Sequence, residues 1–148
     1  MSGESRIDPN HPDYGPVDPH HVQYGPIGHD LGANGFTARQ LARLDEALTL
    51  SSRESGLTFS LYVGELKAPT RAHAEALFER LTDDSVLIAV APGERALHIV
   101  TGPGSSRRLP NRACALAALA MRAAFTSGDL TGGLVTGLRM LSDSAGRI

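Results

Sequence analysis

A continuous apolar run at residues 86–91, with the sequence VLIAVA, constrains the fold more than any other feature of the chain. A strand without polar positions has to be covered on both faces, which is typical of a central strand in an α/β sheet. Residues 57–63 instead alternate between apolar and polar side chains, which predicts a neighbouring strand with one wetter face. Because a helix is expected to begin at Pro69 and to join the two strands, they should be parallel.

The segment before the first strand carries clear signals for the start and the end of a helix. Thr37 and Gln40 have the spacing of a capping box, in which each side chain accepts a hydrogen bond from the backbone of the other. Leucines at helical spacing follow them. Gly56 is a typical residue at a helix C-terminus. These residues predict a helix that begins after Thr37 and ends at Gly56.

The second half of the chain predicts a hairpin and two more helices. A Pro-Gly pair at residues 92–93 favours a type II turn, after which residues 96–101 should return as an antiparallel strand. The most apolar stretch, at residues 113–125, is too short for a membrane span, which needs roughly 20 apolar residues, and it predicts a buried Ala-rich helix. This helix is expected over about residues 109–126. Asp129 is placed to cap the last helix. The expected fold class is α/β, a small mixed sheet with helices on both faces in the order α-β-α-β-β-α-α.

Composition places the chain among ordinary globular proteins and argues against several functions. Of its 148 residues, 41% are hydrophobic and 20% are charged, enough for one real core. The formal net charge of −2 argues against a nucleic-acid binder, which usually has a basic face. The single Cys114 cannot form an internal disulfide, which suits a reducing compartment. The first residues lack an apolar signal segment, so we expect a cytoplasmic protein without a transmembrane segment.

Residues 1–34 differ sharply in composition from the rest of the chain. They hold more than half of the prolines and most of the histidines, and they contain two consecutive copies of one unit, DPNHPDYGPV and DPHHVQYGPI. Proline removes a backbone donor and fixes φ, so neither a regular helix nor a central strand is expected there. We therefore interpret residues 1–34 as a flexible arm and residues 35–148 as the folded domain. The aromatic Tyr-Gly-Pro units offer area that can dock on the domain.

Three stretches of the folded part resemble the TPM-domain superfamily, and most closely an actinobacterial branch of unknown function. Residues 36–59 resemble its opening helix and first strand. Residues 86–102, VLIAVAPGERALHIVTG, resemble its strand hairpin, and residues 126–137, TSGDLTGGLVTG, resemble its closing motif of an acidic Gly-Asp before a Gly-rich helix start. The resemblance covers about residues 36–142 and implies the same α/β fold.

The resemblance also implies a divalent-cation site, because some TPM domains bind calcium and a phosphatase activity has been proposed for plant members. The matching acidic positions are Asp30 in the loop before the first helix, and Asp83 and Asp84 before the second strand. At a third position the family's Leu-Thr-Asp is replaced by a sequence that ends in Asn111. Calcium prefers six to eight oxygen ligands, so losing one acid weakens the expected site. A solvated turn is the alternative interpretation of Asp83 and Asp84, and no cofactor other than such a cation is expected.

The loop before the third helix is a candidate anion site. Ser105, Ser106, Arg107 and Arg108 follow a Gly-Pro-Gly sequence and precede a helix N-terminus. Hydroxyls, free N–H groups and guanidinium groups are typical ligands of phosphate or carboxylate. The loop is not a P-loop, because it lacks the Gly-Lys-Ser/Thr ending. A flexible loop with solubilising charge is the alternative.

Three other patterns favour structural interpretations. The histidines of the arm have no spacing typical of a rigid metal site; they are His11, His20, His21 and His29. Cys114 and His98 would form a nucleophilic dyad only within hydrogen-bond reach, and a buried structural thiol is the preferred interpretation. Gly133 and Gly137 lie four residues apart on one predicted helix face, which indicates close packing of that helix on the sheet or on the preceding helix.

Two functional hypotheses follow from the sequence. The first is a non-catalytic protein-binding or scaffold module with an unidentified protein partner, since no standard set of nucleophile and base is present. The alternative is a divalent-metal-dependent phosphatase, in which Asp30, Asp83 and Asp84 hold the cation and an arginine of the 105–108 loop binds the phosphate. The sequence favours the first hypothesis and predicts no catalytic residue.

Overall fold

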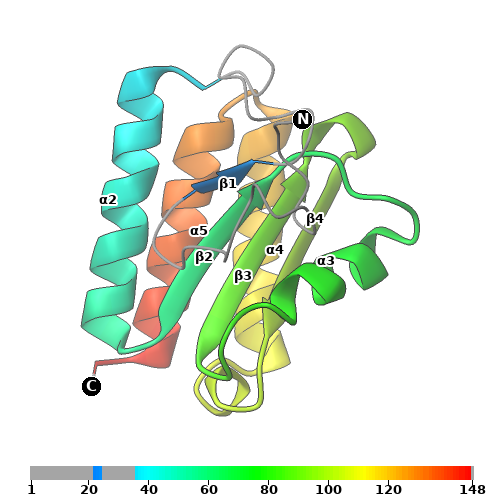
Figure 1. Ribbon diagram of the computed structural model, residues 1–148. Helices are drawn as coiled ribbons and strands as arrows, with labels where there is room; N and C mark the ends of the chain where they lie inside the picture. The colour runs from blue at the N-terminus through cyan, green and yellow to red at the C-terminus, as the bar shows by residue number, and fades with distance from the viewer. Residues whose placement is uncertain (1–21, 25–35, 148) are drawn as a thin grey trace.

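The computed structural model describes residues 22–24 and 36–147 of the chain. Its centre is a four-stranded mixed sheet in the order β1-β2-β3-β4, drawn in Figure 1. The strands are β1 (Val22–Tyr24), β2 (Thr58–Val63), β3 (Ser85–Ala91) and β4 (Ala96–Thr101). The β1–β2 and β2–β3 pairs are parallel and the β3–β4 pair is antiparallel. The predicted hairpin and the predicted parallel pair are therefore confirmed.

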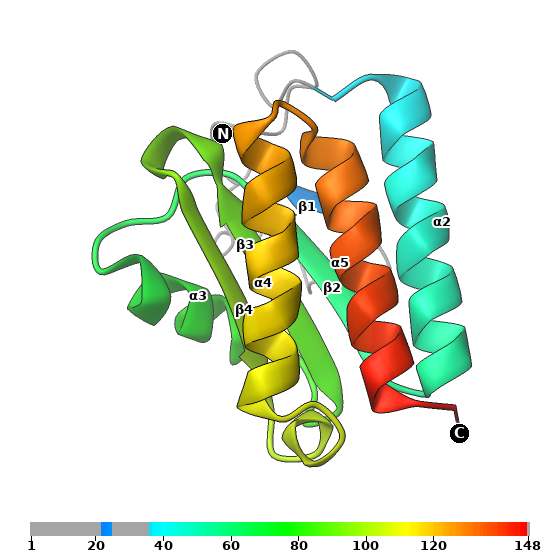
Figure 2. The ribbon, with the colours of Figure 1, turned by 180° about the vertical axis from the view of Figure 1, so that it is seen from behind.

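Helices cover the two faces of the sheet unequally. One face carries α2 (Ala38–Ser55), α4 (Asn111–Thr126) and α5 (Leu130–Ala145), whereas the other carries α3 (Thr70–Phe78). Figure 2 shows α5 in the middle of the three-helix layer, with α2 and α4 on either side of it. Short 3-10 turns, η2 (Pro92–Glu94) and η3 (Ser105–Arg107), follow β3 and β4. The order α-β-α-β-β-α-α is confirmed over residues 36–147.

The strand β1 is an addition that the sequence did not predict. Val22–Tyr24 belong to the segment that we interpreted as an arm, yet they pair with residues 61–63 at the edge of the sheet. An edge position tolerates the prolines nearby, because only one side of such a strand has to form ladder hydrogen bonds. The remainder of the predicted arm, with its histidines and Asp30, lies outside the described residues.

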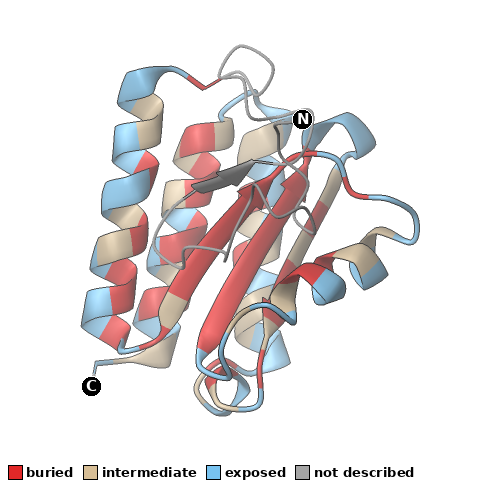
Figure 3. Ribbon diagram, viewed as in Figure 1, coloured by how far each residue is buried: buried red, intermediate tan, exposed pale blue. Residues whose placement is uncertain are grey.

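The core consists of two clusters of buried side chains, one on each face of the sheet. In Figure 3 the ribbons of β2 and β3 are mostly red, the colour of buried residues. The larger cluster lies beneath the three-helix layer and includes Leu44, Leu48, Phe59, Leu61, Ile88, Met121, Leu134 and Leu138. The smaller cluster lies beneath α3 and includes Tyr62, Leu66, Ala74, Leu77, Leu87 and Ala89. The apolar run at residues 86–91 contributes to both clusters, which confirms the prediction of a strand buried on both faces.

The prediction of a wetter face on β2 was wrong. Ser60 is fully buried and Tyr62 is only 3% exposed. Tyr62 packs in the smaller cluster with Leu66 and Ala74, so the segment around α3 covers this end of the strand. Its hydroxyl donates a hydrogen bond to the Glu65 carbonyl oxygen at 2.8 Å, which satisfies the one polar group of the ring. The polar residue types at alternate positions of β2 therefore did not indicate side chains exposed to solvent.

Caps and turns explain where the helices begin and end. The capping box of α2 is confirmed, because the Thr37 hydroxyl accepts from Gln40 N at 3.1 Å and Gln40 Oε1 accepts from Thr37 N at 2.8 Å. Gly56 ends α2 in the left-handed conformation with φ of 80°. Asp129 caps α5 by accepting from Gly132 N at 2.9 Å. The predicted type II turn was wrong: residues 92–94 form a 3-10 turn, and the positive φ of 53° falls on Arg95 rather than on Gly93.

Candidate functional site

The structure brings together the acidic turn at residues 83–84 and the loop at residues 102–108. The Asp83 carbonyl oxygen accepts hydrogen bonds from Gly104 N at 3.1 Å and from Ser105 N at 3.0 Å. A Cβ added to Gly104 would lie 2.1 Å from Oδ1 of Asp84, so that carboxylate rests against the loop backbone. The segment predicted to hold a cation and the segment predicted to hold an anion are thus neighbours.

The side chain of Ser105 is committed to holding this loop in place. Ser105 is fully buried, its hydroxyl donates to the Ser85 carbonyl oxygen at 2.7 Å, and the same oxygen accepts from Gly102 N at 2.9 Å. Ser106 is exposed, and its hydroxyl donates to the Pro103 carbonyl oxygen at 3.3 Å. The two predicted serine ligands therefore differ: Ser105 ties the loop to the start of β3, whereas Ser106 faces solvent.

The two arginines that were predicted as anion ligands also differ in their surroundings. Arg107 is exposed. The Arg108 guanidinium donates to the carbonyl oxygens of Ser55, Ala145 and Gly146, at the C-terminal ends of α2 and α5. Because its donors are directed at the two helix ends, Arg108 has a structural role and does not face an anion at the 102–108 loop.

Asp83 and Asp84 are exposed at the start of β3, while Asp30 lies outside the described residues. Within residues 22–24 and 36–147, no group of three or more His, Cys, Asp or Glu side chains is arranged to hold a metal ion. The prediction of a cation site that includes Asp30 stays a prediction.

Cys114 and His98 lie on opposite faces of the sheet. Cys114 on α4 packs against the larger core cluster, and burial raises the pKa of its thiol, although the Arg71 guanidinium opposes this shift. His98 instead faces α3, where its Nε2 atom lies 2.8 Å from the Thr70 hydroxyl. The structure therefore does not bring the two side chains together as a dyad.

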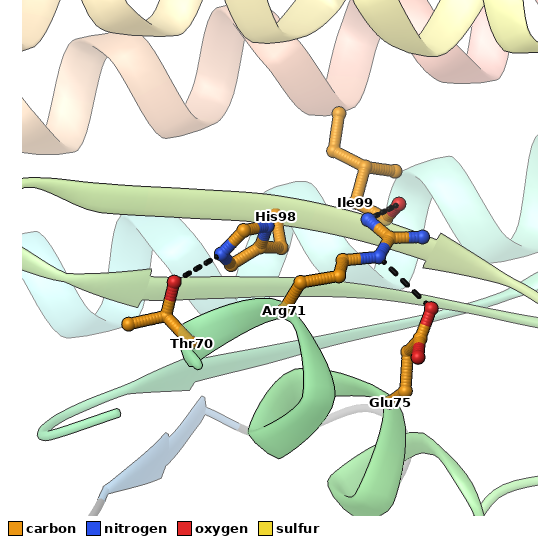
Figure 4. A network of polar contacts seen from close by, with 5 residues as sticks. All are labelled: Thr70, Arg71, Glu75, His98 and Ile99. Carbon is orange, nitrogen blue, oxygen red and sulfur yellow. Dashed lines mark hydrogen bonds and ion pairs between the residues drawn. The ribbon is translucent and has the colours of Figure 1, made fainter. Parts of the chain in front are cut away.

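His98 belongs to a polar network that joins α3 to β4 (Figure 4). Arg71 Nε forms an ion pair with Glu75 at 3.1 Å, and Arg71 Nη1 donates to the Ile99 carbonyl oxygen at 3.1 Å. Burial lowers the pKa of His98, and the positive charges of Arg71 and Arg122 lower it further, while Glu75 opposes them. If His98 were a catalytic base, a further side chain would have to orient its ring. Glu75 does not do this, because it forms an ion pair with Arg71. We therefore interpret this network as structural, because its hydrogen bonds hold α3 against β4.

The outward side of α4 carries two exposed large hydrophobic side chains. Leu116 is 51% exposed and Leu119 is 65% exposed, and they are two of the three large hydrophobic residues exposed within the described ranges. Arg112 and Arg122 flank the two leucines, and two alanines lie between the leucines. We define the α4 outer face as Arg112, Ala115, Leu116, Leu119, Arg122 and Ala123, all of which are exposed.

This surface corrects the prediction of a buried Ala-rich helix. Only Ala117 and Met121 of α4 are buried, because the helix lies at the border of the three-helix layer and contacts α5 and β4 on its inner side. The sequence carries the signal in the order of its residues, since Leu116 and Leu119 lie one turn apart and off the line of Ala117 and Met121. No helix of the described residues is both long and apolar enough to cross a bilayer.

These features define a class of small α/β domains, with a mixed sheet, three helices on one face and one on the other. The chain belongs to the family described as "Domain of unknown function (DUF5130)", which its residues 25–142 match. The uncharacterized protein Rv2468c of Mycobacterium tuberculosis strain H37Rv is 36% identical over 109 residues, as is MT2543 of strain CDC 1551. The matches cover 72% of this chain and 65% of each relative, so the chain spans slightly less than two thirds of the relatives' length.

Solved structures share the fold at low sequence identity. The N-terminal domain of a P. gingivalis protein superimposes with a TM-score of 0.69 at 14% identity, over 95% of this chain and 92% of that domain. The BA42 protein of Bizionia argentinensis gives 0.64 at 19% identity, over 74% and 80%. The N-terminal domain of the cg2496 protein of Corynebacterium glutamicum gives 0.64 at 13% identity, over 95% and 88%. These likenesses establish the fold alone.

Proposed function

We propose that this domain is a non-catalytic protein-binding module that binds an acidic, amphipathic partner segment on the α4 outer face. We also infer that it is a branch of the TPM superfamily. The three stretches that resemble that superfamily correspond to α2 with β2, to the β3–β4 hairpin, and to the α4–α5 turn with the start of α5.

The exposure of Leu116 and Leu119 is the observation that supports binding. Burying a leucine side chain fully contributes roughly 1.5–3 kcal/mol, so two adjacent leucines can anchor a complex. Leu50 on α2 is 45% exposed but has no second exposed large hydrophobic beside it among the described residues. The paired leucines of α4 therefore form a contiguous apolar surface, which in soluble proteins marks interaction sites.

Charge specifies the kind of partner. The α4 outer face contains two basic residues, Arg112 and Arg122, and helix α4 has no acidic residue along its whole length. In an antiparallel pair of two α4 helices centred on the leucines, Arg112 of one copy would face Arg122 of the other. Like charges placed together in an interface cost several kcal/mol, which disfavours a second copy as the partner. A segment with glutamates or aspartates on either side of an apolar stripe fits this face in both shape and charge.

A defined peptide pair tests this proposal. One synthetic helical peptide carries a leucine stripe flanked by glutamates, and its matched control carries lysines at the same positions. We expect the glutamate peptide to shift the backbone amide resonances of α4, and Leu119→Asp to abolish the shifts while Leu50→Asp leaves them intact. Equal binding of both peptides, or equal effects of the two leucine substitutions, would contradict the proposal.

The contribution of the arm needs a separate variant. Deleting residues 1–34 would also remove β1, which pairs with β2, so a deletion that ends before Val22 is the cleaner change. This deletion removes the first Tyr-Gly-Pro unit, residues 14–16, and keeps the second, which begins at Tyr24 of β1. If the first unit contributes to the binding site, the deletion lowers the affinity for a partner captured by the intact chain without lowering the melting temperature. Unchanged affinity would show that residues 1–21 do not contribute to binding.

A divalent-metal-dependent phosphatase is the second candidate, favoured by the adjacency of the 83–84 turn and the 102–108 loop. In this case Asp83 and Asp84 would hold the cation, and Arg107 would bind the phosphate, since Arg108 is engaged at the helix ends. Turnover of an aryl phosphate with magnesium or calcium should fall sharply in Asp84→Asn. Turnover that is the same in this variant and in Asp143→Asn, on the exposed part of α5, would reject this candidate.

A further inference from the structure

A concave surface lies at the end of the β3–β4 hairpin, away from the loop at residues 102–108. It is a cleft of about 480 Å³ between the η2 turn and the turn that joins α4 to α5. Val90 and Leu97 line it from the strands, and Phe125 and Leu130 line it from the helices. Its walls are therefore mainly apolar, and its volume lies within the range of about 300–1,000 Å³ that is typical of small-molecule sites.

Two guanidinium groups give this cleft a positive charge. Arg95 lines it from the hairpin and Arg122 lines it from α4, and no acidic residue is among the lining side chains of the described part. The nearest acids along the chain point elsewhere. Glu94 Oε1 accepts from Leu66 N at 3.5 Å, and Asp129 accepts from Gly132 N at 2.9 Å as the cap of α5. The positive charge is thus left without a counter-charge from these neighbours.

The two arginines are presented in different ways. Arg122 is held in place, because its Nη2 atom donates to the Leu97 carbonyl oxygen at 3.0 Å. Arg95 adopts a φ of 53°, a conformation that is uncommon for residues with a side chain, and it ends the η2 turn. The side chain of Arg95 has no hydrogen bond or ion pair to any residue that the structure describes. One guanidinium is therefore fixed at the rim and the other remains available to a ligand.

We propose that the cleft binds a small organic anion, namely a carboxylate attached to an apolar body. A guanidinium forms two parallel hydrogen bonds with a carboxylate, and Arg95 and Arg122 supply two such groups at one rim. The apolar body would be buried against Phe125, Leu97 and Leu130. A bare inorganic anion would leave those walls exposed, and a neutral apolar molecule would leave the guanidinium groups unpaired.

This site is independent of the proposed partner surface, although Arg122 borders both. Arg95 and Phe125 belong to the cleft alone, and Leu119 belongs to the α4 outer face alone. Leu119→Asp is therefore expected to abolish peptide binding and to leave anion binding unchanged, whereas Arg95→Gln has the reverse effect. Failure of one proposal is thus distinguishable from failure of the other.

The test uses 2-naphthoate as the probe, titrated into the full chain and followed by backbone and arginine side-chain NMR shifts. The controls are 2-naphthamide, which has the same apolar body without the charge, and acetate, which has the charge without the body. We expect saturable shifts at Arg95, Arg122 and Phe125, and binding at least about tenfold weaker for each control. For 2-naphthamide the loss comes from the missing charge that pairs with the guanidinium groups, and for acetate it comes from the missing apolar body.

Two variants complete the test. Arg95→Gln should weaken 2-naphthoate binding about tenfold by the same reasoning, while Arg53→Gln, an exposed arginine at the far end of α2, should have no effect. Equal affinity for 2-naphthoate and 2-naphthamide would mean apolar adsorption and would overturn the proposal. Unchanged binding by the Arg95 variant would also overturn it, as would shifts that map to the 102–108 loop instead.

Discussion

The Nη2 atom of Arg108 lies 2.9 Å from the backbone carbonyl oxygen of Ala145, so a residue just before α4 caps the end of α5. The same guanidinium donates to the carbonyl oxygen of Ser55, the last residue of α2. The final carbonyl groups of a helix have no partner within the helix, and a cation near them is favoured by the helix dipole. Arg108 thus joins the ends of two helices that are distant in sequence.

Replacing Arg108 should destabilise the fold, whereas replacing its neighbour should not. Arg108→Ala removes a charged donor from three carbonyl groups, and we expect a loss of about 2–3 kcal/mol in the free energy of unfolding. Arg107→Ala should change it by less than about 0.5 kcal/mol, because Arg107 is exposed. Urea unfolding of both variants checks this, and equal losses would contradict the assignment.

The serine pair offers a second matched comparison. Ser105→Ala leaves the Ser85 carbonyl oxygen and the Gly102 N–H group without their partner in a buried place, at a cost of about 1–3 kcal/mol. Ser106→Ala should cost no more than about 0.5 kcal/mol, because its hydroxyl is exposed. Thermal unfolding of the two variants measures the difference. Similar melting temperatures would show that the buried hydroxyl contributes little.

Gly137 should be intolerant of even a methyl group. A Cβ at this position would lie 2.4 Å from Sδ of Met121, which is itself fully buried, so Gly137→Ala should cost about 1–3 kcal/mol by overpacking. Thr136→Ala on the exposed side of the same helix is the control. Adding Met121→Ala should make the cost of Gly137→Ala smaller than it is alone. Strictly additive losses in unfolding free energy would contradict direct contact between the two residues.

The free energy of unfolding should depend on pH through His98. Its pKa is lowered in the folded chain by burial and by Arg71 and Arg122, so the unfolded chain binds more protons at mildly acidic pH. Above the ordinary histidine pKa of about 6.5, His98 is neutral in both states and the free energy of unfolding is at its full value. As the pH falls toward the lowered pKa of the folded chain, the unfolded chain takes up a proton first and this stability is lost.

His98→Gln should therefore reduce the stability difference between about pH 7.5 and about pH 5.5. Urea unfolding at the two pH values measures this difference, and the carboxyl groups contribute alike to both proteins. His73 has a pKa lowered by burial and by Lys67, so His73→Gln should act in the same direction. A pH dependence identical to that of the unmodified chain would show that His98 does not couple to folding.

Local sequence signals predicted the folded part well because they act within a few residues. The capping box of Thr37 and Gln40 and the cap at Asp129 depend on spacing alone. The alternation of Phe59 and Leu61 with polar residues correctly indicated which side chains face the larger core. The spacing of Gly133 and Gly137 predicted close packing on the sheet or on the preceding helix, and the structure shows that the neighbour is the helix α4, where Met121 lies against Gly137.

The features that the sequence did not predict depend on how distant segments pack together. The burial of Tyr62 depends on where α3 and its preceding loop lie, and the exposure of Leu119 depends on the place of α4 at the border of a layer. The structural role of Arg108 required helix ends that are 53 and 37 residues away along the chain. The cleft beside Arg95 required a turn type that the Pro-Gly pair did not predict.

The contacts that Arg71 and Arg122 make with β4 have a consequence for how the sheet ends. This strand lies at the border of the sheet, and its outward carbonyl oxygens at Ile99 and Leu97 accept from these two guanidinium groups. A foreign strand that sought to extend the sheet would have to displace both cations. Charged side chains at such a border are a known protection against aggregation, so the two arginines disfavour the addition of a foreign strand along β4.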